Sequence, residues 1–159
     1  MAIGIDAQIL IWGIKRQATP NRQQMIPRAE RFFRRCKDDG KRIYVPAQSL
    51  AELLVGYSAA QRRQTLATLP KSFLIAPFDA KAAAIAAELQ HNWDHLKQVG
   101  SEYGITRQQI KADINVLASA IAAGASYLYS EDGQMKSFAQ GKIIVCGLPE
   151  MDDQKSLFG

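Results

Sequence analysis

Four acidic residues, spread along the chain, have the types and positions needed to hold a divalent metal ion. They are Asp6, Glu52, Asp113 and Asp132. Carboxylates that lie close together repel one another unless a cation neutralises them, and an all-oxygen ligand set selects Mg²⁺ or Mn²⁺ over zinc. One or two such ions suit phosphodiester hydrolysis, because they generate the attacking hydroxide and stabilise the leaving oxygen. This chemistry needs no nucleophilic side chain.

Short β-branched runs alternate with longer stretches of helical period, which predicts βα units around a parallel sheet. Strands are expected at residues 2–6, 42–45, 73–76, 126–130 and 142–146, and helices at 25–37, 47–66 (in one or two pieces), 79–97 and 106–123. Glycines that follow helical runs predict helix ends at Gly40, Gly100 and Gly124. We expect one α/β domain over residues 1–148 and a short acidic tail over residues 149–159.

Ligands of open α/β sheets bind at the carboxyl ends of the strands. Asp6 ends the first expected strand, and Ser130, Glu131 and Asp132 leave the end of the fourth. Because successive residues leaving a strand point to opposite faces, only one of the two adjacent acids is expected to be a ligand, and we choose Asp132.

The other two acids lie on expected helices. Asp113 borders the apolar stripe of its helix, where an ionised carboxylate is costly unless it is paired or bound to a metal. An arginine partner or a local cap is the alternative for Asp113. Glu52 lies one turn beyond the second strand, opposite the apolar stripe of its helix, and is either a surface glutamate or part of a helix covered on two faces.

Four segments that contain these acids, in this order, resemble the PIN domains, and specifically the VapC-type ribonuclease toxins. The segments are Gly4-Ile5-Asp6-Ala7-Gln8-Ile9-Leu10, Pro46-Ala47-Gln48-Ser49-Leu50-Ala51-Glu52-Leu53, Asp113-Ile114 leading into Ala118-Ser119-Ala120, and Leu128-Tyr129-Ser130-Glu131-Asp132. The chain departs from the family in two places. Gln8 stands where the family often has Asn or Ser, and Met135 where a Phe is common.

The resemblance implies a three-layer α/β/α PIN-like domain with a five-stranded, mainly parallel sheet. It implies a Mg²⁺- or Mn²⁺-dependent endoribonuclease, the toxin of a type II toxin–antitoxin pair, with an antitoxin partner and commonly a homodimer. On this resemblance Asp6, Glu52, Asp113 and Asp132 are the metal-binding catalytic acids, and Ser130 supports them by hydrogen bonding. The alternative is a catalytically weak PIN-like module that binds RNA or protein.

Charge is distributed unevenly along the chain. Residues 1–63 carry 12 basic and 5 acidic side chains, whereas residues 64–159 carry 8 and 10. The excess favours a polyanionic partner such as RNA, although an ordinary solvated face explains it as well. The candidate RNA-steering group is Lys15, Arg16, Arg28, Arg31, Arg34, Arg35, Lys37, Lys41 and Arg42.

Further features bear on partners and compartment. Gly56, Ser58, Ala59 and Ala60 are small enough for a partner helix to approach closely, or for core packing. His91 and His95 have the spacing of a zinc pair on one helix, without the glutamate of a metalloprotease motif, and lie near Trp93. No secretory signal or membrane span is apparent, so we expect a cytoplasmic protein.

Overall fold

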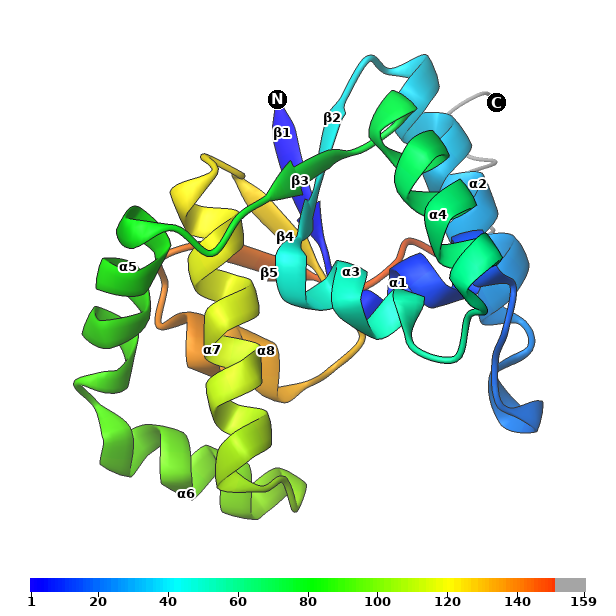
Figure 1. Ribbon diagram of the computed structural model, residues 1–159. Coiled ribbons are helices and arrows are strands. Elements are labelled where there is room, and N and C mark those ends of the chain that lie inside the picture. Colours follow the sequence, from blue (N-terminus) through cyan, green and yellow to red (C-terminus); the bar gives the residue numbers. More distant parts are fainter. Residues whose placement is uncertain (151–159) are drawn as a thin grey trace, which may run out of the picture.

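The computed structural model describes residues 1–150 and shows five parallel strands between two layers of helices (Figure 1). The strand order is β3-β2-β1-β4-β5, and all four neighbouring pairs are parallel. The strands are β1 (Ala2–Ile5), β2 (Arg42–Pro46), β3 (Leu74–Ala76), β4 (Tyr127–Tyr129) and β5 (Ile144–Cys146). The predicted fold class is confirmed, with each strand within two residues of its expected bounds.

Helices cover both faces of this sheet (Figure 1). They are α1 (Ala7–Leu10), α2 (Met25–Asp38), α3 (Ala47–Leu54), α4 (Ala59–Thr68), α5 (Ala80–Gln90), α6 (Trp93–Tyr103), α7 (Arg107–Ala122) and α8 (Gln134–Ala139). One core contains buried residues of α5 to α8, and the other contains buried residues of α1, α2 and α3. Two hydrophobic cores, one on each face, explain why the strands read as nearly continuous apolar runs.

Close packing of α7 on the central strand sets the position of Asp113. A Cβ atom at Gly4 would lie only 3.1 Å from Cβ of Ala120, so the missing side chain lets the helix approach β1. Asp113 precedes Ala120 by about two helical turns, which carries it toward the carboxyl end of β1. Gly4 therefore helps to bring Asp113 near Asp6.

The expected helix at residues 79–97 is wrong as a single helix. It is interrupted at His91 and Asn92, which separate α5 from α6. Gly100 does not end a helix either, because it lies buried inside α6, where an added Cβ would come within 2.6 Å of Ile110 Cδ1. Gly104, with φ of 66°, ends α6 instead. The glycine at 100 thus provides room for α7 rather than a stop signal.

Two short helices flank the carboxyl ends of strands and were not predicted. The chain turns directly from Asp6 into α1 and continues as a π-helical turn, Ile11–Lys15. After β4 it enters α8, whose Gln134 and Met135 are buried. Both helices are too short for a periodic pattern to identify them.

The last described residues are held against α2 by Arg28. Its guanidinium donates hydrogen bonds to the carbonyl oxygens of Leu148 (2.7 Å) and Pro149 (3.3 Å) and pairs with Glu150 (3.5 Å). Arg28 therefore fastens the end of the domain rather than facing solvent in the steering group. The predicted boundary at residue 148 stays a prediction, and residues 151–159 of the expected tail lie outside the described part.

Within residues 1–150, no helix combines the length and the apolar character that crossing a membrane would require.

Candidate active site

Asp6 is the most buried of the four acids. It caps α1: Oδ1 accepts a hydrogen bond from the Ala7 amide (2.8 Å), while Oδ2 accepts one from the Ser130 hydroxyl (2.8 Å). Burial raises the pKa of Asp6 to about 6, against the lowering effect of the Ser130 hydrogen bond, and the charges of Asp132 and Glu52 raise it further. The carboxylate is thus fixed in position but short of compensating positive charge.

Ser130 connects Asp6 to the loop after β4. Besides donating to Asp6, its hydroxyl oxygen accepts a hydrogen bond from the amide of Asp132 (3.1 Å). The neighbouring Glu131 turns to β5, where its Oε1 accepts from the amide of Leu148 (2.7 Å) and its carboxylate lies against Gly147. Glu131 is therefore engaged in structure, and Asp132 is the acid of this loop whose charge acts on the other three sites.

Asp113 lies on α7 and is partly buried. Burial, opposed by the hydrogen bond from Gln134 Nε2 to Oδ2 (3.2 Å) and assisted by the charges of Asp6, Asp132 and Glu52, raises its pKa to about 7. The Gln134 hydrogen bond connects Asp113 to the segment after β4, which also contains Ser130 and Asp132. The structure therefore brings Asp113 to the same edge as Asp6.

Glu52 occupies the last turn of α3, next to the fully buried Leu53. It is exposed, although partial desolvation, and then the charge of Asp132, raise its pKa. Of the two interpretations left open, the structure shows the surface glutamate, because the side of α3 that carries Glu52 is exposed, and the charge of Asp132 acts on it there. The four acids together are called the acidic edge below.

The acidic edge has the donor chemistry of a site for a hard divalent cation. Its ligands are carboxylate oxygens, and a cation would offset the repulsion and desolvation that raise three of the four pKa values. In the described part of the chain, no three His, Cys, Asp or Glu side chains already surround a common point as ligands. Glu52 and Asp132 are exposed and have flexible side chains, so rotation of these two is what would complete the set.

Gln134 is a supporting residue that sequence reasoning missed. It is buried, opens α8 and donates to Asp113. The sequence did contain a signal for Gln134: it is a polar residue two positions after a candidate acid and directly before the apolar Met135. Gln8, whose substitution for Asn or Ser was noted, is exposed and lines an open cavity of about 510 Å³ together with Arg16, Gln17 and Thr19.

The two histidines do not form a pair on one helix. His91 follows the end of α5, whereas His95 lies in α6, and His95 Nε2 is 3.4 Å from the carbonyl oxygen of Ser137. Trp93 is partly buried and carries Arg107 over its ring at 5.1 Å. His95 therefore lies at the contact between α6 and α8, whereas His91 is exposed at the end of α5.

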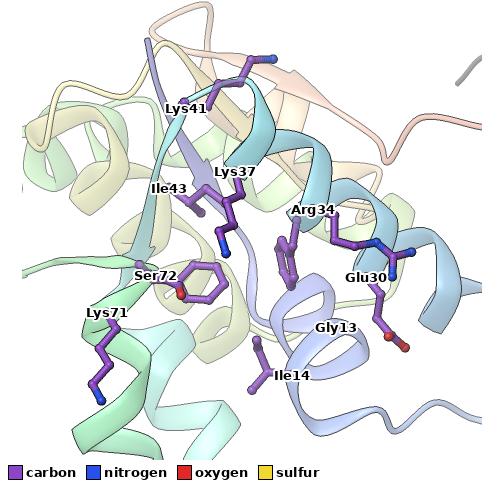
Figure 2. A pocket seen from close by; sticks show the side chains of 12 residues that line it. Gly13, Ile14, Glu30, Arg34, Lys37, Lys41, Ile43, Lys71 and Ser72 are labelled. Atoms are coloured by element: carbon purple, nitrogen blue, oxygen red, sulfur yellow. The ribbon is translucent and has the colours of Figure 1, made fainter. Parts of the chain in front are cut away.

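A basic cavity lies at the other end of the strands, near the starts of β2 and β3. It has a volume of about 530 Å³ and is bordered by Arg34, Lys37, Lys41 and Lys71. Figure 2 shows Lys37 reaching from α2 over the cavity, with Lys71 on the opposite wall. The floor is apolar and includes Phe33 and Phe73, whose rings meet edge to face at 5.2 Å. Three members of the candidate steering group are therefore gathered around one hollow, remote from the acids.

Comparison with known proteins identifies the family. The family model of the PIN domain matches residues 3–141. The chain therefore belongs to the PIN domain family. A search of curated protein sequences gives no match.

Two solved structures are similar in fold. VapBC2 from Rickettsia felis, bound to a DNA fragment from its promoter, contains a chain with 18% identity and a TM-score of 0.57; the alignment covers 94% of this chain and 100% of that one. VapBC-5, a toxin–antitoxin system from Mycobacterium tuberculosis, contains one with 19% identity and a TM-score of 0.46, covering 94% and 98%. At this identity the first similarity supports the fold.

Proposed function

We propose that this PIN-domain protein is a metal-dependent endoribonuclease that hydrolyses RNA phosphodiester bonds and acts as the VapC-type toxin of a type II toxin–antitoxin pair. The observation that carries the proposal is the acidic edge, where the charges of four carboxylates from different elements act on one another. Family membership supports nuclease chemistry, and the similar Rickettsia felis chain comes from a VapBC complex.

Asp6, Glu52, Asp113 and Asp132 would hold Mg²⁺ or Mn²⁺. Such an ion, when bound, would activate a water molecule for attack and would offset the negative charge on the phosphate and the leaving oxygen. The chain's own task is to orient the carboxylates. Ser130 and the Ala7 amide fix both oxygens of Asp6, while Gln134 fixes one oxygen of Asp113 and leaves the other accessible.

The direct test is cleavage of a mixed RNA substrate by purified protein with Mn²⁺, with Mg²⁺ and with a chelator. Asp113→Asn is the informative variant, because it keeps the shape and removes the charge. Asp38→Asn is the matched control, an exposed helical aspartate at the opposite end of the strands. We expect metal-dependent cleavage by wild type and Asp38→Asn and none by Asp113→Asn.

Two other results would contradict the activity. Equal cleavage by wild type and Asp113→Asn would indicate a contaminating nuclease. RNA binding without cleavage by either protein would favour the alternative, a PIN-like module that has lost turnover.

The protein partners follow from α4, which we propose contacts an antitoxin or a second copy of the chain. This helix has no buried residue, so core packing does not explain the small residues that begin it. Val55 before the helix and Leu66 within it are 71% and 49% exposed. Light scattering after gel filtration tests the homodimer: we expect a dimer that Leu66→Glu weakens, and a monomeric wild type would contradict it.

A further inference from the structure

Tyr103 is an exposed aromatic residue that lies beside the acidic edge. It ends α6, and 51% of its surface is exposed. Its ring lies against Gly133, because a Cβ atom built at Gly133 would be 2.8 Å from Tyr103 Cε1 and 2.9 Å from its hydroxyl oxygen. Tyr103 thus contacts the loop after β4 with one part of its ring and leaves the rest open to solvent.

The loop that Tyr103 contacts contains residues that form hydrogen bonds at the acidic edge. Gly133 separates Asp132, whose amide is bound to Ser130, from Gln134, which donates to Asp113. The backbone at Gly133 has φ of −60° and ψ of −30°, which any residue adopts. The glycine is therefore needed for space, and what occupies that space is the ring of Tyr103.

An exposed aromatic face next to a candidate site of phosphodiester cleavage is suited to binding single-stranded RNA. Every nucleobase has a π-face, and aromatic side chains bind single-stranded RNA by stacking on unpaired bases. Arg107, an exposed residue at the start of α7 four positions after Tyr103, is a positive charge that lies over the ring of Trp93. An acidic peptide or a small anion would use the charge but not the ring.

We propose that Tyr103 forms a nucleobase-stacking subsite, which holds a base of single-stranded RNA next to the phosphodiester bond at the acidic edge. This proposal rests on the proposed function, because it assigns a subsite to the same substrate. Tyr103 is a binding residue here and contributes no proton or ligand to the reaction. Its contact with Gly133 places the ring next to the residue that follows Asp132.

The test measures binding of a short single-stranded oligoadenylate in an Asp113→Asn background with Mg²⁺, so that cleavage does not interfere. Tyr103→Leu keeps an apolar contact with Gly133 and removes the π-face, whereas Tyr103→Phe keeps the π-face. We expect Tyr103→Leu to weaken binding about 5- to 150-fold and Tyr103→Phe to bind like the parent. Phe78→Leu, a change at a 40% exposed aromatic residue beyond the edge strand β3, is the matched control and should have no effect.

A second measurement separates stacking from a purely structural role. The affinities of oligonucleotides that lack one base, at successive positions, should each be measured for the Tyr103→Leu variant and for its parent. At the stacked position the missing base should abolish the difference between the two proteins, since no partner remains for the ring. A loss of affinity that is the same for every oligonucleotide would instead indicate a distorted loop and overturn the subsite.

Other outcomes distinguish this proposal from the nuclease. If Tyr103→Leu binds RNA as tightly as its parent while wild type cleaves RNA, the subsite is wrong and the nuclease stands. If binding depends on Tyr103 but wild type never cleaves, the subsite stands and the nuclease is wrong. If no variant binds the oligonucleotide, the subsite is wrong.

Discussion

The two ends of the strands carry opposite charge and are built in opposite ways. At the carboxyl ends, the acidic edge holds two of its four carboxylates in a desolvated environment, which raises the pKa of Asp6 to about 6 and that of Asp113 to about 7. At the amino ends, the basic cavity has an apolar floor and places its cations on long side chains around the rim. Long side chains keep their charges in water, whereas short ones on a packed edge do not.

The difference indicates which end a bound cation would stabilise. Charged groups on the rim of the basic cavity remain hydrated, so they need no bound partner to offset them. Carboxylates at the acidic edge are held by Ser130 and Gln134 in positions where they repel, which only protonation or a cation relieves. The following predictions test this contrast, from the largest expected effect to the smallest.

Removing the support of the acidic edge should have the largest effect. Ser130→Ala deletes the donor to Asp6 and the acceptor for the Asp132 amide, so we expect metal-dependent cleavage to fall about 10- to 100-fold. Ser126→Ala, at an exposed position before β4, should cleave normally. Cleavage rates at saturating Mn²⁺ provide the measurement, and an unchanged rate for Ser130→Ala would show that the carboxylates orient themselves.

Asp113 should lower the stability of the metal-free protein above neutral pH. Its pKa is raised on folding, so its contribution to stability is fully present below about pH 4 and is lost as the pH rises through about 7. Asp113→Asn avoids this loss, and with chelator at pH 8 we expect its free energy of unfolding to exceed that of wild type by about 1–3 kcal/mol. Urea titrations at pH 4 and pH 8 measure it.

The control for this prediction is the divalent cation itself. Added Mg²⁺ should narrow the difference between the two proteins, because the cation stabilises the carboxylate and not the amide. A variant that is less stable than wild type at pH 8 without metal would contradict the description of the acidic edge as strained by its own charge.

A substitution in the apolar floor of the basic cavity should have a smaller effect than a change at the acidic edge. A methyl group added at Gly13 would overlap the ring of Phe33, and that ring borders the cavity into which it can move. We expect Gly13→Ala to lower the free energy of unfolding by about 1 kcal/mol, the lower end of the cost of overpacking. Thermal unfolding measures the change, and a loss of folding would show that the cavity cannot accept the ring.

Single cations of the basic cavity should have the smallest effect. Lys37→Gln and Lys71→Gln should each weaken association with a long RNA about two- to fivefold and leave cleavage of a short oligonucleotide unchanged. RNA affinity measured at several salt concentrations, with Lys97→Gln on α6 as the control, provides the test. Removing one lysine–phosphate interaction lowers the slope of log affinity against log salt concentration by about 1. If all three variants behave alike, the cavity does not contact RNA.

The sequence predicted the sheet because strands have local patterns, such as the apolar run of β2 that a proline ends. The four acids were singled out by position: Asp6 and Asp132 follow strands, whereas Glu52 and Asp113 lie on helices. Their role as metal ligands stays a prediction. The break between α5 and α6 was missed because nothing in His91 or Asn92 forbids a helix. It depends on the packing of α6 against α7, where Gly100 meets Ile110.

Contacts between distant residues could not be predicted from the sequence. Arg28 looked like its arginine neighbours on α2, and its bonds to Leu148 and Pro149 depend on where the segment after β5 packs. Gln134 and Tyr103 likewise gain their roles from residues on other elements. Side chains of the same type therefore differ in function according to the tertiary neighbour that each one meets.

The strand order also determines when this site can form during synthesis. The central strand β1 pairs with β2 early, but its second neighbour is β4, and the hydrogen bond between Ser130 and Asp6 joins residues 124 positions apart. Closing a loop of this length has an entropic cost that local contacts do not have. Residue 130 must also have left the ribosome before the bond can form, so a nascent chain that ends before β4 contains Asp6 without Ser130 and Asp132.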